Sequence, residues 1–249
     1  MSVTFLERAG APSLAYDAQS GRSGPTVVFL PGFLSDMNGT KAVFMAERCA
    51  RRDQPMIRFD YRGHGQSQGV FEEGNIGLWL EDTLAILDAL VKGPCIVIGS
   101  SMGGWIGLLA ALARSKVVRG FIGIAAAPDF TRDIHRRMGE SEREQMAREG
   151  RFLLPDVFGT GVHYMTQQFL DEGEAHILLE SPIKLDCAVR LMQGTDDTDV
   201  PVAWAQSIME KLTAADKRLH IVESGDHRLS APEQLELLDS LVREISEKI

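Results

Sequence analysis

The sequence contains no long hydrophobic run and no excess of positive charge. A membrane-spanning helix needs about 20 consecutive apolar residues, and no stretch of this chain comes near that length. The chain has 26 Lys and Arg residues against 35 Asp and Glu residues, which leaves a formal net charge of -9. Nucleic acids and anionic membrane surfaces bind basic faces. We therefore expect no nucleic-acid partner and no stable membrane insertion.

Cysteine is also scarce, with Cys49, Cys95 and Cys187 as the whole complement. An odd number at wide spacing excludes a complete disulfide framework and indicates a reducing compartment. No Cys/His cluster has the spacing of a zinc site, so we expect neither a metal nor a cofactor. The first residues show no charged segment followed by an apolar core, which argues against a secretory signal peptide. Together these features predict a cytoplasmic location.

What the sequence does contain is an alternation of apolar β-prone runs with amphipathic stretches along its 249 residues. Continuous apolar runs indicate strands covered on both faces, and their alternation with helices predicts an α/β fold with a mostly parallel, doubly wound sheet. A chain of this length fits a single domain. Strands are expected at Val3–Glu7, Ser13–Asp17, Thr26–Leu30, Met56–Asp60, Val118–Ala126, Ala188–Met192 and Leu219–Val222, and a central one begins at Cys95.

The alternation is interrupted between residues 128 and 186, where we expect a small, mainly helical cap inserted into the domain. Residues Asp129–Arg151 are dense in charges of both signs, a pattern most simply explained as a solvated helix face with i,i+4 ion pairs. Pro155–Gly159 then breaks the chain, and Tyr164–Leu179 has a helical pattern.

One short motif stands out at the end of the central strand. Gly99–Gly103 reads G-x-S-x-G with Ser101 at its centre. A serine in this motif occupies a strained strand-to-helix turn that exposes its hydroxyl above the sheet. The amides at the start of the following helix favour negative charge beside it. Ser101 is therefore the candidate nucleophile.

A serine hydroxyl needs a base within hydrogen-bonding distance, and that base needs a carboxylate to orient it. His227 follows the last strand, on a loop at the same edge of the sheet as Ser101, and is the preferred base. His220 lies within that strand, and the histidines of the cap segment are more simply surface residues. His64 also follows a strand, but no carboxylate-bearing loop precedes it in the required order.

The carboxylate is expected in the loop Gly194–Pro201, which follows its own strand and holds Asp196, Asp197 and Asp199. Such a loop could equally be a solvated turn rich in helix-capping residues. At most one of the three aspartates is catalytic, and the residue pattern alone leaves the choice open. The order along the chain is serine, then aspartate, then histidine.

An oxyanion produced at the substrate carbonyl needs two backbone N–H donors. Met102 follows the nucleophile and is expected to supply one of them. Phe33, in the turn after the strand Thr26–Leu30, is expected to supply the other, while its ring either lines the substrate pocket or packs in the core. Leu34 and Met37 are further candidate pocket walls. Trp105 is expected to pack in the core.

With these residues assembled, the chain resembles the α/β-hydrolase superfamily. The matching segments are Leu30–Phe33, Asp60–Ser67, Gly99–Gly103, Asp197–Pro201 and Gly225–His227. The resemblance covers nearly the whole chain outside the cap. Aligning the acid loop with the pattern of the superfamily selects Asp197 over its two neighbours. It implies that Ser101, Asp197 and His227 form a catalytic triad.

Further segments resemble one branch of the superfamily, which contains a mitochondrial palmitoyl-protein thioesterase that also hydrolyses acyl glucuronides. These segments are Met37–Ala42, Ile57–Tyr61, Gly99–Trp105 and Ser181–Ile183. The resemblance implies a serine hydrolase acting on acyl thioesters or carboxylic esters of small molecules or acylated proteins. The animal proteins carry a transit segment, whereas this sequence begins close to its first expected strand, so we expect a cytoplasmic bacterial relative.

Other readings of the same residues remain open. A general short-chain carboxylesterase or a C–C bond hydrolase would use the same triad, and a binding module without catalysis would normally have a broken one. Dehalogenases and epoxide hydrolases of this fold carry an aspartate where this chain has Ser101. Arg132, Arg136 and Arg137 could meet an anionic leaving group, although solvated arginines are the commoner case.

Overall fold

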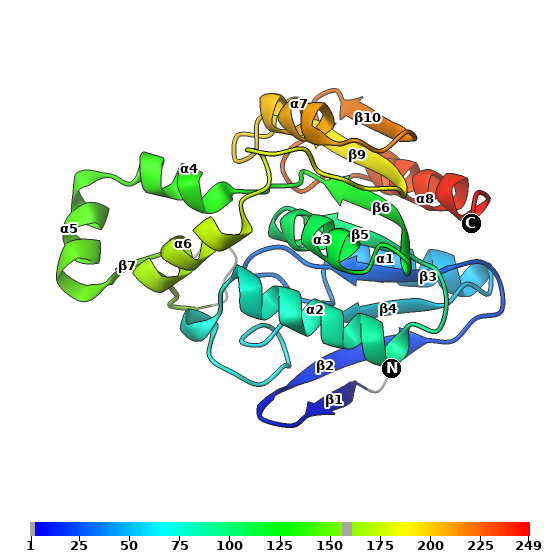
Figure 1. The fold of residues 1–249 in the computed structure, drawn as a ribbon, viewed down its shortest axis with the longest axis horizontal. Coiled ribbons are helices and arrows are strands. Elements are labelled where there is room, and N and C mark those ends of the chain that lie inside the picture. Colours follow the sequence, from blue (N-terminus) through cyan, green and yellow to red (C-terminus); the bar gives the residue numbers. More distant parts are fainter. Residues whose placement is uncertain (1–2, 156–160) are drawn as a thin grey trace.

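The computed structural model describes residues 3–155 and 161–249, and its centre is a twisted eight-stranded sheet. The strand order is β1-β2-β4-β3-β5-β6-β9-β10 (Figure 1). In this order, the pairings β1–β2 and β2–β4 are antiparallel, and the remaining pairings of this sheet are parallel. The strands are β1 (Thr4–Arg8), β2 (Ala11–Gln19), β3 (Thr26–Leu30), β4 (Met56–Phe59), β5 (Cys95–Ser100), β6 (Val118–Ile124), β9 (Ala188–Gly194) and β10 (Lys217–Val222).

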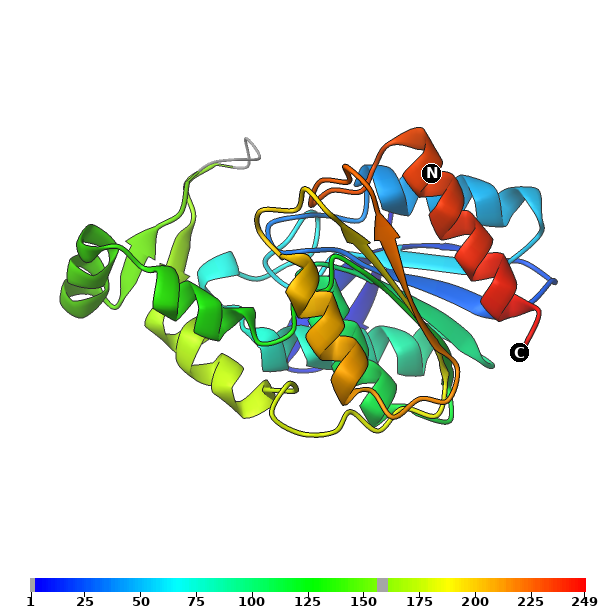
Figure 2. The same ribbon diagram turned by 90° about the horizontal axis from the view of Figure 1, so that it is seen from above.

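Helices cover both faces of this sheet, as expected for strands with apolar side chains on both sides. In β3, Val27 and Phe29 pack with α1 (Thr40–Arg51) and α8 (Pro232–Ser246) on one face. Val28 and Leu30 point to the other face, which is covered by α2 (Ile76–Leu90), α3 (Met102–Ala113) and α7 (Val202–Lys211). Figure 2 shows α1 and α8 on one side of the sheet and these three helices on the other. The predicted doubly wound α/β fold is confirmed.

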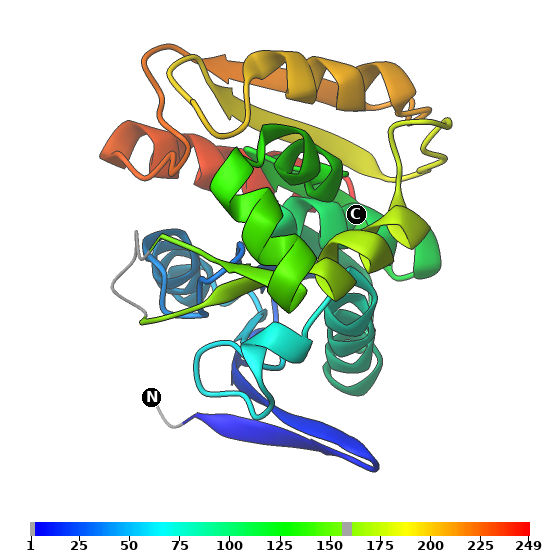
Figure 3. The same ribbon diagram turned by 90° about the vertical axis from the view of Figure 1, so that its left-hand side faces the viewer.

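The segment between β6 and β9 leaves the sheet and forms its own group of elements, which we call the cap segment (residues 128–186). It contains α4 (Phe130–Arg137), α5 (Glu140–Glu149), the antiparallel pair β7 (Arg151–Leu153) and β8 (Tyr164–Thr166), α6 (Gln167–Gly173) and a 3-10 turn at Glu174–His176. In the view with the cap segment toward the reader, these elements lie in front of the edge of the central sheet (Figure 3). A second 3-10 turn, Phe71–Glu73, lies in the loop before α2.

The cap segment differs from the sequence-based expectation at one place. Tyr164–Leu179 has a helical pattern, but its first three residues form β8 and the helix extends over Gln167–Gly173. The hydroxyl of Thr166 accepts a hydrogen bond from the Phe169 N–H, which caps the helix and fixes its start. The expected chain break at Pro155–Gly159 lies, from residue 156 onward, outside the described residues.

Asp129 ties the two ends of the cap segment together. Its side chain is buried, and its two carboxylate oxygens accept hydrogen bonds from the backbone N–H groups of Leu178 and Leu179, each at 2.8 Å. Asp129 itself adopts a left-handed conformation with φ of 64°, which aspartate tolerates better than most residues. The chain therefore enters and leaves the cap at neighbouring points above the sheet.

Candidate active site

Ser101 sits in the sharp turn between β5 and α3. Its φ of 53° and ψ of -117° are far from the helical and extended regions that L-residues prefer. The glycines around it are required by close packing: a Cβ on Gly99 would lie 2.2 Å from the Gly103 carbonyl oxygen, and one on Gly103 would lie 2.2 Å from that of Leu30. Strand, turn and helix can approach this closely because these positions lack side chains.

The structure brings Ser101, His227 and Asp197 together from three separate loops. The Ser101 Oγ lies 3.1 Å from His227 Nε2. The other ring nitrogen, Nδ1, lies 2.9 Å from Asp197 Oδ2 and 3.1 Å from Oδ1. With the Asp197 carboxylate accepting from Nδ1–H, the Nε2 lone pair faces the serine hydroxyl. This tautomer can accept a proton from Ser101.

Among the three aspartates of the acid loop, Asp197 is the buried one, and Asp196 and Asp199 are exposed. The Asp197 Oδ1 also accepts the backbone N–H groups of Asp199 and Val200, at 3.0 Å and 2.8 Å. Burial raises the pKa of Asp197, but hydrogen bonds from His227, Val200 and Gln193 outweigh burial and leave this pKa below its usual value. The carboxylate therefore stays ionised beside the imidazole.

Gln193 is a residue of the site that sequence reasoning missed. It is buried near the end of β9, and its amide nitrogen donates to Asp197 Oδ2 at 2.9 Å and to the Val200 carbonyl at 2.7 Å. It thereby holds the turn that carries the carboxylate. The available signal was a polar residue inside an apolar strand, four positions before the aspartate.

The turn after β3 passes directly beside the nucleophile. A Cβ built on Gly32 would lie 3.4 Å from the Ser101 Cβ, and the next residue, Phe33, lines the same cavity as Ser101. Met102 is the first residue of α3, where backbone N–H groups have no partner within the helix. The buried Asp60 carboxylate anchors the turn by accepting the Met37 N–H at 2.7 Å.

Ser101 and His227 open onto a cavity of about 440 Å³ whose wall is mostly apolar. Its volume falls in the range of small-molecule sites, roughly 300–1,000 Å³. Leu34 and Met37, expected as pocket walls, do not line it, and Met37 is buried. The cap segment supplies much of the wall instead, through Phe130, Ile134, Met138, Phe152, Leu154 and Met165, which join Phe33 and Met102 from the main domain.

The remaining aromatic and histidine candidates have structural surroundings. Trp105 is buried, and its indole N–H donates to the His176 carbonyl at 2.9 Å. His64 is buried in contact with the rings of Phe71 and Trp79, and burial lowers its pKa to about 4. The Phe33 ring has both of the roles considered for it, because it packs among aromatic rings and also lines the cavity.

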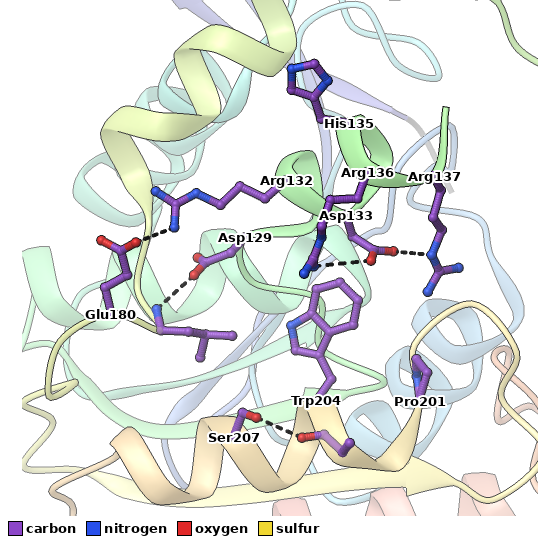
Figure 4. A pocket seen from close by; sticks show the side chains of 12 residues that line it. Asp129, Arg132, Asp133, His135, Arg136, Arg137, Glu180, Pro201, Trp204 and Ser207 are labelled. Atoms are coloured by element: carbon purple, nitrogen blue, oxygen red, sulfur yellow. Dashed lines mark hydrogen bonds and ion pairs between the residues drawn. The ribbon is translucent and has the colours of Figure 1, made fainter. Parts of the chain in front are cut away.

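The three cap arginines border a second cavity, of about 800 Å³, between α4 and α7 (Figure 4), and Arg137 also lines the cavity beside Ser101. Arg132 pairs with Glu174 and Glu180. Arg136 and Arg137 both contact the carboxylate of Asp133, at 3.3 Å and 2.6 Å. Each guanidinium thus already faces a carboxylate of the cap segment, as the solvated-helix interpretation predicts.

Within the described part of the chain, one group of side chains has the proximity needed to hold a metal ion: Asp197, Asp199 and His227. Two of these three residues are already joined by the Asp197–His227 hydrogen bond. In the same part of the chain, no helix combines the length and apolarity needed to cross a membrane.

Comparison with known proteins extends these observations. A model of the alpha/beta hydrolase family matches residues 27–236. The mitochondrial palmitoyl-protein thioesterase ABHD10 of Homo sapiens is 36% identical over 249 residues, covering 100% of this chain and 81% of that protein. The Mus musculus protein of the same name is also 36% identical, and the match covers 84% of its length.

Solved structures agree with these matches. Mouse alpha/beta hydrolase domain-containing protein 10 superposes with a TM-score of 0.91 at 36% identity, covering 100% of this chain and 99% of that one. A putative hydrolase from Agrobacterium vitis S4 superposes with a TM-score of 0.93 at 35% identity, covering 98% of both chains. These findings confirm the resemblance to the thioesterase branch and the prediction of a hydrolase. The family model and these full-length matches show that the chain belongs to the alpha/beta hydrolase family.

Proposed function

We propose that this hydrolase cleaves acyl thioesters or carboxylic esters through an acyl-enzyme intermediate. The observation that carries the proposal is the unbroken hydrogen-bonded path from Asp197 through His227 to Ser101, which ends beside an apolar cavity. An apolar cavity suits an acyl chain, and a serine with a bound base suits attack on its carbonyl.

In the proposed mechanism, Ser101 Oγ attacks the acyl carbonyl carbon while His227 Nε2 accepts the hydroxyl proton. Asp197 holds the imidazole in the required tautomer and stabilises the imidazolium. The N–H groups of Phe33 and Met102 bind the oxyanion of the tetrahedral intermediate. Because the neutral imidazole acts as the base, activity is expected to fall as the pH is lowered.

Collapse of this intermediate breaks the bond to the leaving group. The imidazolium of His227 returns its proton to the departing thiolate or alkoxide, and the acyl group stays on Ser101. Water then attacks the acyl-enzyme with His227 again as the base. A second collapse releases the carboxylic acid and restores the serine hydroxyl.

Long-chain acyl thioesters, including S-acylated proteins, are the substrates we favour. The relatives named as palmitoyl-protein thioesterases match along the full chain, and the cavity beside Ser101 is lined by large apolar side chains. Acyl glucuronides are a second substrate class of the proposed function. The cap segment, as an insertion in a single domain of residues 1–249, would then set the chain-length preference.

A cytoplasmic location completes the proposal. Cys49, Cys95 and Cys187 are free thiols and all three are buried. Burial raises the pKa of Cys95 to about 12, which keeps this thiol protonated and unreactive. Fractionation of cells that produce the protein, followed by immunoblotting, would test the location.

The decisive experiment compares hydrolysis of acyl thioesters and oxygen esters of increasing chain length by the wild type and by Ser101→Ala. We expect a Ser101-dependent optimum at long acyl thioesters and a loss of roughly 10⁴-fold or more in kcat in the variant. Labelling with a fluorophosphonate, which reacts with activated serines, provides an independent readout.

Two outcomes would redirect the proposal. A Ser101-dependent preference for short oxygen esters would identify a general carboxylesterase. Absence of Ser101-dependent turnover and labelling would leave the fold intact and remove the proposed chemistry.

A further inference from the structure

A second, smaller cavity also reaches Ser101, and none of the described residues of the cap segment lines it. Its volume is about 230 Å³, and like the apolar cavity it is lined by Phe33, Ser101 and His227. The rest of its wall comes from the turn after β3, the first turn of α1 and the loop that carries His227. Those segments contribute mainly polar side chains, namely Ser35, Asp36, Thr40, Lys41, Arg228 and Ser230.

The two cavities differ in polarity and converge on one nucleophile. An ester or thioester has two halves, an acyl chain and a leaving group, which diverge from the carbonyl carbon that Ser101 attacks. The larger cavity, with its phenylalanine and methionine wall, suits the acyl chain. The smaller cavity, whose wall has the larger share of polar surface, is then the place for the leaving group.

Lys41 gives the small cavity a specific chemistry. It is the second residue of α1 and is half-buried. Its ammonium group donates to the backbone carbonyl of Arg228, the residue after His227. An ammonium has three N–H donors, and this contact uses one of them. The others remain for a ligand in the cavity.

The charges around Lys41 favour an anionic ligand. Burial lowers the pKa of Lys41 to about 8, with Asp226 raising it and Arg228 lowering it further. Two basic side chains, Lys41 and Arg228, line this cavity against one carboxylate, that of Asp36. The adjoining N-terminus of α1 has no side-chain cap, so its backbone N–H groups add partial positive charge on the same side.

We propose that this small polar cavity binds the leaving group of the substrate, and that Lys41 recognises a carboxylate on it. The inference rests on the proposed function, because it divides the same ester between two subsites. The cavity volume lies below the roughly 300–1,000 Å³ of sites for drug-sized ligands. Among the substrates of the proposed function, it therefore suits thioesters and esters of small acids and not S-acylated proteins.

The cap arginines are a weaker alternative for the same role. Arg132, Arg136 and Arg137 each face a carboxylate, and the 800 Å³ cavity that they share is not lined by Ser101. Arg137 also lines the apolar cavity beside Ser101, but its guanidinium is paired there with Asp133 at 2.6 Å. Lys41 lines the smaller cavity together with Ser101 and His227, and its ammonium contacts a backbone carbonyl and not a carboxylate. A leaving group attached to the scissile carbonyl reaches Lys41 without crossing the cap.

The test uses two thioesters with the same octanoyl group, one of mercaptoacetate and one of the neutral mercaptoacetamide. The quantity measured is the ratio of their kcat/KM values, anionic over neutral, in the wild type and in Lys41→Met. Comparing ratios between proteins cancels the different intrinsic reactivities of the two thioesters. We expect Lys41→Met to lower the ratio about tenfold, the size of one charge-assisted hydrogen bond.

Control variants separate recognition from a general charge effect. Lys41→Arg keeps the positive charge and is expected to retain most of the preference. Lys116→Met removes the same charge at an exposed turn before β6 and is expected to leave the ratio unchanged. In the wild type the ratio should fall above about pH 8, where Lys41 loses its proton. This pH dependence needs no variant and holds even if Lys41→Met does not fold.

The outcomes distinguish this inference from the proposed function. If Ser101→Ala hydrolyses both thioesters as fast as the wild type, the proposed function fails. If turnover depends on Ser101 but the ratio is the same in the wild type and Lys41→Met, or does not change with pH, the assignment of Lys41 is overturned. A ratio lowered equally by Lys116→Met would also overturn it.

Discussion

At the scale of single residues, Ser101 occupies a backbone conformation that a residue with a side chain normally avoids. Its φ of 53° is maintained because Gly99 and Gly103 let the strand, turn and helix pack without intervening side chains. Holding such a residue costs of order 1–3 kcal/mol. The surrounding packing holds the turn in this conformation despite that cost. The Ser101 hydroxyl is directed at His227 as a result.

Asp197 allows a sharp prediction at this scale. An asparagine would keep the shape and could still accept the Val200 N–H, but it would not hold the imidazole as a carboxylate does. We expect Asp197→Asn to lower kcat about 10⁴-fold through the wrong tautomer of His227, with KM changed far less. Steady-state kinetics on an octanoyl thioester would measure this.

Circular dichroism would serve as the control for folding of Asp197→Asn. The variant Asp196→Asn alters an exposed aspartate of the same loop and should retain near wild-type kcat. A loss smaller than tenfold in Asp197→Asn would show that another group orients His227.

At the scale of secondary-structure elements, a buried arginine joins β9 to α8. Arg190 is fully buried in β9, and its guanidinium contacts Glu244 of α8 at 2.7 Å and Asp216 at 2.9 Å. The hydrogen bond from Arg190 is the main cause of the low pKa of Glu244, which is about 2. Burial opposes this shift, and the hydrogen bond from Lys248 lowers the pKa further. This contact anchors the C-terminal helix to the strand that leads to Asp197.

Glu244→Gln is therefore expected to destabilise the protein by about 1–3 kcal/mol at pH 7, because Arg190 loses a charged partner. The pKa of Glu244 is lower in the folded state than its ordinary value of 4.5. Its stabilising contribution is thus complete above pH 4.5 and is lost as the pH falls toward 2. Urea unfolding at several pH values would measure both effects.

The control for this prediction is Glu247→Gln, an exposed position just after the same helix. It should leave the unfolding free energy nearly unchanged. If Glu244→Gln lost as much stability as the wild type between pH 4.5 and 2, the pH dependence would have to come from other carboxylates.

At the scale of the whole molecule, loops at one edge of the sheet hold the residues of the proposed chemistry. The cap segment supplies much of the wall of the 440 Å³ cavity proposed to bind the acyl chain. The three side chains of the triad follow β5, β9 and β10, at one edge of the sheet. Phe152 and Met165, which line the cavity, come instead from the hairpin β7-β8. Substitutions in the cap should therefore change substrate preference more than the chemical step.

Met165→Trp tests this division. Met165 is buried and lines the cavity, so the larger ring should shorten the space for an acyl chain. We expect kcat/KM for long acyl thioesters to fall at least about tenfold while short ones are retained, with a stability loss of about 1–3 kcal/mol from overpacking. Rates over a chain-length series, with thermal melting, would measure both.

Leu153→Trp provides the matched control, because Leu153 belongs to the same hairpin but is exposed and does not line the cavity. Its chain-length profile should match that of the wild type. An unchanged profile in Met165→Trp as well would show that the acyl chain binds elsewhere.

The sequence by itself determined the alternation of strands and helices, because central strands such as β3 and β5 are largely apolar runs between turn residues. It also determined which residue types follow which strands. In a parallel sheet the carboxyl ends of the strands share one edge. The sequence therefore predicts that Ser101, the acid loop and His227 lie close together. The acid-loop pattern of the superfamily then accounted for the choice of Asp197 among three aspartates.

The tertiary structure alone decided what surrounds that edge. Leu34 and Met37 are near Phe33 in sequence, yet they do not line the apolar cavity, because Asp60 from another strand binds the Met37 backbone and directs that turn. The positions of Gln193 and Lys41 depend on contacts that no sequence motif describes. Gln193 donates a hydrogen bond to Asp197, four residues further along, and Lys41 donates one to the carbonyl of Arg228, 187 residues away. Side-chain direction in turns depends on packing partners far away in the chain, and that information appears only once the chain has folded.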